Sequence, residues 1–217
     1  MSIQTLSLDA LLTGAPAFIA PGVMSAMDKK PRSGTVRIGW LGVEGDHQAD
    51  TFHHGGHDKA IHLFPQEHYD WWREPLGDHA LLRAPGAFGE NLATRGATED
   101  GLCVGDRFTL GSALLEISHG RQPCAKLNFR FGRPDVLATA VRSGRCGLYL
   151  RVLKEGEARA GDAMTLIERP LPEWSIARVF NLLIQGGHKA EPAGVAQLAA
   201  MPQLAEAWRS RAIALAR

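Results

Sequence analysis

The chain has few cysteines, no long hydrophobic run and almost no net charge, and each absence excludes a class of protein. Three cysteines in 217 residues are too few for a disulfide framework or for the thiolates of a plant-type iron–sulfur cluster. The sequence shows neither a run of about eighteen apolar residues nor a signal peptide, so we expect a cytoplasmic protein that does not bind membranes. A net charge of +1 argues against a nucleic-acid partner.

Most of the chain is nevertheless typical of a globular protein rich in strands. Hydrophobic residues make up 45% of it, which is enough for a substantial core. Alternating apolar segments bounded by Gly and Pro predict strands, with two or three short helices between them. The segments at 105–110 and 161–166 share a Gly-Asp turn followed by a strand, which indicates repeated corners of a barrel.

The composition changes at Pro170, where a segment rich in Ala and Leu begins. Gly186-Gly187 and Pro202 divide this segment into pieces with helical spacing, so we expect a three-helix unit. The unit contains little obvious chemistry. Its expected role is docking or dimerisation, and a homodimer is the assembly that it would support.

The segment 120–128 brings together a cysteine, an arginine and a predicted helix start. Pro123 tolerates the first turn of a helix, so we expect Cys124 in the opening turn, where free N–H groups and the helix dipole favour a thiolate. The fixed charge of Arg121 acts in the same direction. This segment alone leaves open the alternative that Cys124 is an ordinary buried cysteine packed beside Leu127.

A second group of polar residues lies at 42–59. Gly55 and Gly56 stand among histidines and Lys59, which favours a loop whose N–H groups and cations face an anion. Lys29, Lys30 and Arg32, in a polar loop upstream, could form an anion-binding rim, but solvated charge is the favoured interpretation. A metal site and simple turn histidines remain alternatives, although the spacing matches no common zinc motif. The side chains able to ligate a metal are His53, His54, His57, Asp46 and Asp50.

Five motifs in a fixed order link these segments. They are Gly-Val-Glu-Gly-Asp (42–46), His-Gly-Gly-His-Asp-Lys-Ala (54–60), Phe-Pro-Gln-Glu-His-Tyr (64–69), Phe-Gly-Glu-Asn-Leu (88–92) and Arg-Gln-Pro-Cys-Ala-Lys-Leu (121–127). Together they resemble the MOSC family, the C-terminal domain of molybdenum cofactor sulfurase, and in particular its YiiM-like stand-alone bacterial members. The resemblance implies a mainly β or α+β fold, with a β-barrel domain and short peripheral helices at residues 1–168 and a three-helix extension at residues 169–217.

The same resemblance implies a protein that binds the molybdenum cofactor, a molybdopterin-type group, with Cys124 as the ligand to molybdenum. Active members are reductases that remove oxygen from N-hydroxylated bases and hydroxylamines. This chain carries no ferredoxin module, so its electrons would come from a separate reductase. Two alternatives are a carrier of cofactor or sulfur without turnover, and a cofactor-free thiol hydrolase in which His119 or His57 is the base for Cys124.

Individual roles can then be assigned as expectations. A cofactor phosphate needs cations and N–H groups, and the residues expected to bind it are His54, Gly55, Gly56, Lys59 and Arg121. Asn91 and Ser118 are expected to hydrogen-bond the pterin edge. Reduction of an N–O bond to an amine and water consumes protons, so the expected catalytic residues are Cys124, His57 and Asp58.

Overall fold

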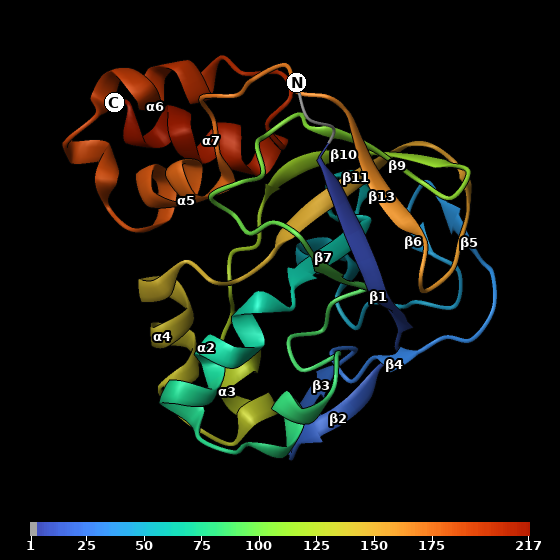
Figure 1. Ribbon diagram of the computed structural model, residues 1–217. Helices are drawn as coiled ribbons and strands as arrows, with labels where there is room; N and C mark the ends of the chain where they lie inside the picture. The colour runs from blue at the N-terminus through green and yellow to red at the C-terminus, as the bar shows by residue number, and fades with distance from the viewer. Residues whose placement is uncertain (1–3) are drawn as a thin grey trace.

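The computed structural model describes residues 4–217, apart from the side chain of His53. Its centre is a closed β-barrel (Figure 1) in which the strands pair in the order β13-β9-β10-β11-β7-β8-β1, and β13 pairs with β1 to complete the ring. Every pair in this ring is antiparallel except β7 with β8. The barrel strands are β1 (Thr5–Thr13), β7 (Ile61–Pro65), β8 (Leu92–Arg95), β9 (Arg107–Leu110), β10 (Ala113–Gly120), β11 (Leu148–Lys154) and β13 (Ala163–Glu168).

Shorter elements surround the barrel. The strand β4 (Lys30–Pro31) pairs with β1, while β2 (Ala17–Ala20) and β3 (Val23–Ser25) form a hairpin and β12 (Gly156–Ala158), β5 (Val36–Gly39) and β6 (Gly42–Val43) form a small sheet. The helices before the C-terminal segment are α1 (Thr51–His54), α2 (Glu67–Leu76), α3 (Lys126–Phe131) and α4 (Val136–Ser143), with short 3₁₀ turns η1 (His57–Lys59) and η2 (Ala80–Arg83). This arrangement confirms the α+β fold with a β-barrel that the sequence predicts.

The two Gly-Asp turns are equivalent corners of the barrel, as the sequence predicts. In each turn the aspartate accepts a hydrogen bond from the backbone N–H three residues earlier, from Cys103 to Asp106 (2.9 Å) and from Arg159 to Asp162 (2.9 Å). The strands that follow, β9 and β13, pair with each other. Each corner therefore ends a loop and starts a strand by the same local interaction.

Charged side chains form a row across four neighbouring strands, which we call the charge ladder. Glu168 on β13 pairs with Arg107 on β9 (2.6 Å), Arg107 with Glu116 on β10 (2.8 Å), and Glu116 with Arg151 on β11 (2.8 Å). All three pairs lie directly opposite each other in the strand register. Opposite charges at such positions stabilise the register, and Arg151 extends the row to Asp58 of η1 (2.8 Å).

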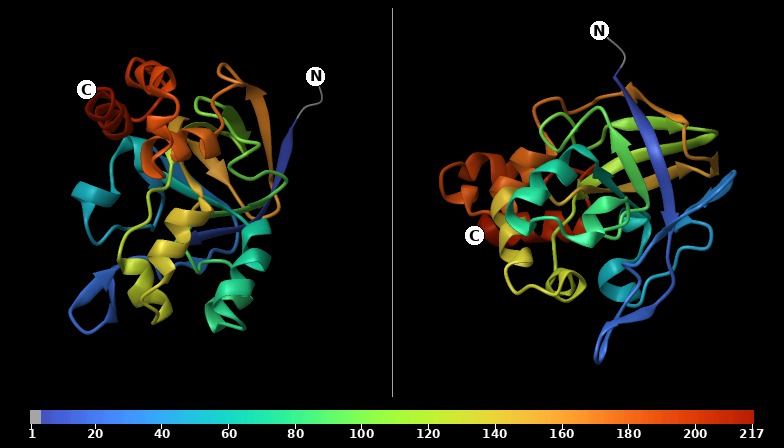
Figure 2. Two further views of the ribbon diagram at one scale, coloured as in Figure 1. Left: turned by 90° about the vertical axis from the view of Figure 1, so that its left-hand side faces the viewer. Right: turned by 60° about the horizontal axis from the view of Figure 1, so that its bottom comes forward.

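The C-terminal segment forms helices α5 (Ile176–Ile184), α6 (Pro192–Ala199) and α7 (Glu206–Leu215), with a 3₁₀ turn η3 (Gly187–Lys189), as the sequence predicts. Figures 1 and 2 show these helices gathered at one end of the barrel. Ala205 N donates to Ser118 O (3.1 Å), and a side chain at Gly120 would lie 3.1 Å from Ile176 and 3.2 Å from Trp208. The helices therefore dock tightly on the end of β10.

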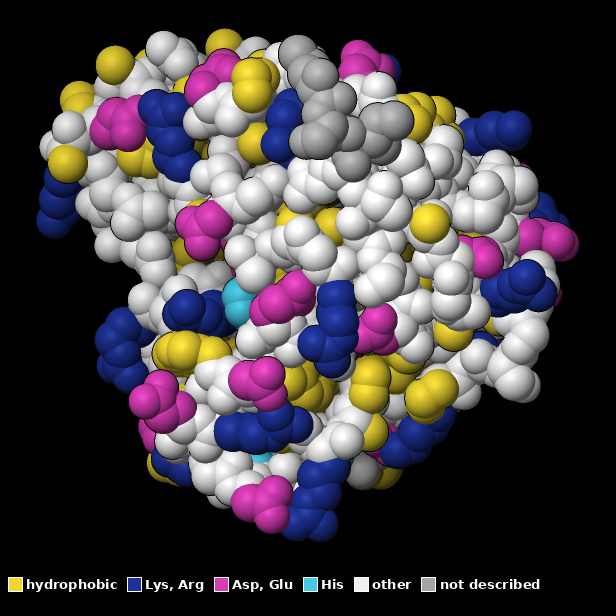
Figure 3. Space-filling view, in the orientation of Figure 1, with side chains coloured by type: hydrophobic (Ala, Val, Ile, Leu, Met, Phe, Trp, Pro, Cys, Tyr) yellow, Lys and Arg dark blue, Asp and Glu magenta, His cyan; other side chains and the backbone are white. Residues whose placement is uncertain are grey.

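The surface carries charges of both signs. Figure 3 shows basic and acidic side chains mixed over one face of the molecule, as the net charge of +1 leads one to expect. No helix among residues 4–217 is long and apolar enough to cross a membrane.

The buried ring of His119 makes the fold sensitive to acid. It lies between Tyr149 (5.2 Å between ring centroids) and Trp208 (5.4 Å). Burial, and then the charges of Lys59 and Arg151, lower its pKa to about 3. The unfolded chain binds a proton at this residue below about pH 6.5, whereas the folded protein does not, so stability decreases as the pH falls through this window.

We therefore expect His119→Gln, which keeps a polar side chain beside Ser118, to reduce the loss of stability between pH 7 and pH 5 by about 2 kcal/mol. The measurement is the free energy of unfolding in urea at both pH values. Equal losses in the wild type and the variant would contradict the lowered pKa.

Candidate functional site

A cavity of about 80 Å³, partly open to solvent, lies beside the ends of β7, β10 and β11. Four cationic side chains line it, against two carboxylates and three histidines. The cations are Lys29, Lys59, Arg121 and Lys126, the carboxylates Asp46 and Asp50, and the histidines His47, His54 and His62. The cavity is therefore suited to an anionic ligand.

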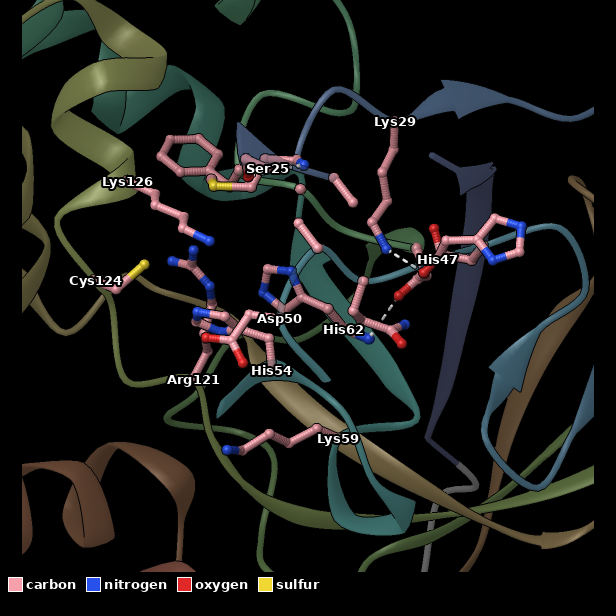
Figure 4. A pocket seen from close by; sticks show the side chains of 18 of the residues that line it. Ser25, Lys29, His47, Asp50, His54, Lys59, His62, Arg121, Cys124 and Lys126 are labelled. Atoms are coloured by element: carbon pink, nitrogen blue, oxygen red, sulfur yellow. Dashed lines mark hydrogen bonds and ion pairs between the residues drawn. The ribbon is translucent and has the colours of Figure 1, made fainter. Parts of the chain in front are cut away.

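Cys124 provides the thiol of this cavity. It is half-buried, and Figure 4 shows it together with Arg121 and Lys126 around one part of the cavity. The expected position in the opening turn of a helix is wrong, because α3 begins only at Lys126. Cys124 instead lies in the turn before the helix, where its carbonyl accepts a hydrogen bond from Leu127 N (3.1 Å).

Arg121 is the buried cation of the site. Arg121 is only 5% exposed, and its Nη1 has no hydrogen-bond partner among the described residues. The backbone holds the residue in place, since Arg121 N donates to Gly147 O (3.0 Å). A buried guanidinium N–H without a partner is costly. An anionic ligand in the cavity would satisfy it.

The positive charge of the cavity is reflected in the histidines. The pKa of His54 is lowered by burial and then by the nearby charges of Lys126 and Arg121, while Asp50 opposes the shift. The pKa of His62 lies well below its ordinary value, chiefly because the ring is buried and then because Arg121 is close. Both effects favour neutral imidazoles near neutral pH.

Two cavity residues arise from strand pairing. His62 on β7 lies directly opposite Tyr149 on β11, with 5.3 Å between their ring centroids. Tyr149 lines the cavity with Arg121, whose charge opposes the rise in the Tyr149 pKa that burial causes. Neither residue was predicted to belong to the site, because a histidine and a tyrosine inside predicted strands give no local signal of a ligand.

Lys29 also lines the cavity, although the sequence favours solvated charge over an anion-binding rim for this polar loop. Here the residue is only 9% exposed and its Nζ lies 2.5 Å from Asp46 Oδ2. Burial lowers its pKa, and Asp46 opposes this shift. Asp46 Oδ1 in turn accepts from Gly14 N (2.8 Å). The solvated interpretation of Lys29 is therefore wrong, and the residue forms part of the cavity wall.

The cavity brings together half of the residues that the sequence singles out, namely His54, Lys59, Asn91, Arg121 and Cys124. The amide of Asn91 already has backbone partners, because its Oδ1 accepts from His62 N (3.1 Å) and its Nδ2 donates to Leu12 O (3.2 Å). It therefore fixes the strand ends at the edge of the cavity.

The other expected residues lie outside the cavity lining. Ser118 is fully buried, and its hydroxyl donates to Asp58 O (2.6 Å). The carboxylate of Asp58 faces Arg151 and α7, while His57 is exposed. None of these three side chains lines the cavity. The structure therefore does not bring Ser118, expected to contact the pterin, or His57 and Asp58, expected to donate protons, into the site.

The paired glycines have a conformational role. Gly56 has a φ of +96°, a region that side chains disfavour. A Cβ at Gly55 would lie 2.8 Å from Thr51 O. The loop can therefore follow this path only with glycine at both positions.

The alternative of a metal site in the loop finds no support, since no three His, Cys, Asp or Glu side chains among those described could together hold a metal ion.

Known proteins resemble the chain in sequence and in structure. Residues 50–165, a little over half of the chain, match the MOSC domain. YflK of Bacillus subtilis (strain 168) is 36% identical over 192 residues, which cover 88% of this chain and 83% of YflK. A protein of Gibberella moniliformis named "Reductase" is 41% identical over 162 residues, which cover 74% of this chain but only 29% of that protein.

The structural similarity extends over the C-terminal helices. The crystal structure of YiiM from Geobacillus stearothermophilus is 31% identical, with a TM-score of 0.82, and the match covers 98% of this chain and 100% of that one. The motifs, the barrel and these relatives agree. The chain belongs to the MOSC domain family and is a YiiM-like member of it.

Proposed function

We propose that the chain is an oxidoreductase that binds the molybdenum cofactor and reduces N-hydroxylated small molecules, such as hydroxylaminopurine-type bases and hydroxylamines. Its electrons come from a separate reductase. The observation that carries this proposal is that the thiol of Cys124 and the unpaired, buried Nη1 of Arg121 belong to one cationic cavity. The relative named "Reductase" supports redox chemistry in the family.

The residues of the cavity fit the cofactor. A thiolate at Cys124 is a soft ligand that matches molybdenum. Arg121 Nη1 lacks a partner, and Lys59 and Lys126 line the same cavity, so these residues would hold the phosphate of the cofactor. The pair formed by Lys29 and Asp46 would hydrogen-bond the polar edge of the pterin. When bound, the cofactor supplies the redox chemistry that removes an oxygen atom from the substrate.

The chain itself must supply protons to the departing oxygen. His57 and Asp58 do not line the cavity, whereas His54 does. A histidine whose pKa is lowered by burial and by Lys126 and Arg121 gives up a proton readily once it has taken one up. We therefore assign the proton delivery to His54.

A thiol hydrolase is disfavoured, because neither His119 nor His57 lines the cavity with Cys124.

The first test is the metal content of protein produced in a host that makes the cofactor. We expect molybdenum in the wild type and a loss of about tenfold or more in Cys124→Ser, because removing even a residue that only orients a metal ligand typically costs about 10- to 100-fold. Cys103→Ser is the matched control, because Cys103 lies outside the cavity and its thiol donates to Pro172 O (3.5 Å). Near-zero molybdenum in both the wild type and Cys124→Ser would contradict the proposal.

The second test separates an enzyme from a carrier. Molybdenum-loaded protein with a chemical electron donor should reduce hydroxylamine and 6-hydroxylaminopurine, and His54→Gln should slow turnover without loss of bound metal, because it removes only the proton donor. The readout is the rate of amine formation. Loaded protein that reduces neither compound would show a carrier instead.

The third test concerns the anion site in protein without cofactor. Arg121→Met removes charge-assisted hydrogen bonds and should weaken the binding of inorganic phosphate by about 10- to 100-fold. Titration calorimetry provides the affinity. Arg133→Met is the control, since Arg133 pairs with Asp135 (2.6 Å) at the surface and does not line the cavity. Equal affinities in the wild type and Arg121→Met would rule out Arg121 as the anion ligand.

A further inference from the structure

We propose that Asp58 is a positioning residue, which ties the cationic wall of the cavity to the C-terminal helix α7. The inference rests on the proposed function only in that the cavity binds an anion. It gives the C-terminal helices a part in the site, although none of their residues lines the cavity.

Asp58 is bound by three elements that come from different parts of the chain. Its Oδ1 pairs with Arg151 of β11 (2.8 Å), and its Oδ2 accepts a hydrogen bond from Glu206 N, the first residue of α7 (3.2 Å). Its backbone carbonyl accepts from the hydroxyl of Ser118 on β10 (2.6 Å). Side chain and backbone are therefore both fixed, and the residue does not line the cavity.

The contact with α7 replaces a cap that the helix lacks. The residue before α7 is Ala205, which has no side-chain acceptor, so the helix has no cap of its own. Asp58 supplies a carboxylate to Glu206 N, one of the free N–H groups of the first turn, where an acceptor and a negative charge stabilise a helix. The start of α7 is also fixed by Ala205 N, which donates to Ser118 O (3.1 Å).

The same contact fixes the position of a cavity residue. Lys59 follows Asp58 directly and lines the cavity, and Lys59 N donates to Gly56 O (3.0 Å) within η1. The turn is too short to hold a position by itself. Asp58 therefore has two effects: it holds Lys59 against the cavity, and its own carboxylate is bound by Arg151 and the start of α7.

The charge ladder fixes Arg151, the ion-pair partner of Asp58. Arg151 is held from its other side by Glu116 (2.8 Å), which is only 4% exposed. Glu168 lies at the far end of the ladder, on β13, and contacts neither η1 nor α7 in any described ion pair or hydrogen bond. Replacing Glu168 therefore removes one carboxylate of the charge ladder and leaves the contacts of Asp58 intact, so Glu168→Ala is the matched control.

The test uses the full chain without cofactor and compares Asp58→Ala, Asp58→Asn and Glu168→Ala with the wild type. Hydrogen exchange is measured at residues 54–60 and at the first turn of α7, and the affinity for inorganic phosphate is measured by titration calorimetry. Asp58→Ala should exchange faster at both segments and bind phosphate about fivefold more weakly, because Lys59 is no longer held in place and about one hydrogen bond to the anion is lost.

The conservative variant separates positioning from general destabilisation. Asp58→Asn keeps an acceptor for Glu206 N but loses the charge, so it should fall between the wild type and Asp58→Ala in both measurements. Glu168→Ala should match the wild type. Unchanged exchange in folded Asp58→Ala or Asp58→Asn would overturn the proposal, as would an equal loss in Glu168→Ala. Wild type that fails to bind phosphate would contradict the anion site, whereas the exchange measurements would still decide the positioning role.

Discussion

The register of β10 against β11 decides where the functional side chains lie. Glu116 faces Arg151 and His119 faces Tyr149, with an irregularity between Ile117 and His119 that changes the alternation. A shift of one residue in a strand pair moves every side chain to the other face, and an irregularity re-aims the residues beyond it. This pairing thus sets both the charge ladder and the direction in which the chain leaves β10 towards Arg121 and Cys124.

The cluster of cations around the cavity destabilises the folded protein when no anion is bound. Four cations border one cavity, Arg121 Nη1 has no partner among the described residues, and the pKa values of Lys29, Lys59 and His54 are all lowered by burial. Asp46 offsets part of this cost at Lys29. Like charges held together in this way repel each other, so an anionic ligand in the cavity would stabilise the folded protein.

Neighbouring side chains of the motif at 54–60 contact two different parts of the structure. His54 and Lys59 border the cavity, whereas Asp58 turns to Arg151 and α7, and the two glycines give the backbone its path. Polar residues that stand side by side in a sequence need not share a task. Adjacent side chains in a short turn point in different directions, so the partner of each is set by what packs against that side.

Local patterns in the sequence predict most of the helices and strands and the chemistry carried by neighbours in the chain. Period-two alternation gave the strands, the Gly-Asp turns gave the barrel corners, Ala and Leu at helical spacing gave the C-terminal helices, and Arg121 and Cys124 stood in one motif. These features depend on local interactions. Only the tertiary structure decided that Lys29 and Tyr149 meet that motif, and that Asp58 caps a helix 148 residues further along. Such contacts depend on strand register and helix docking, which join distant segments and leave no trace in the residues next to them.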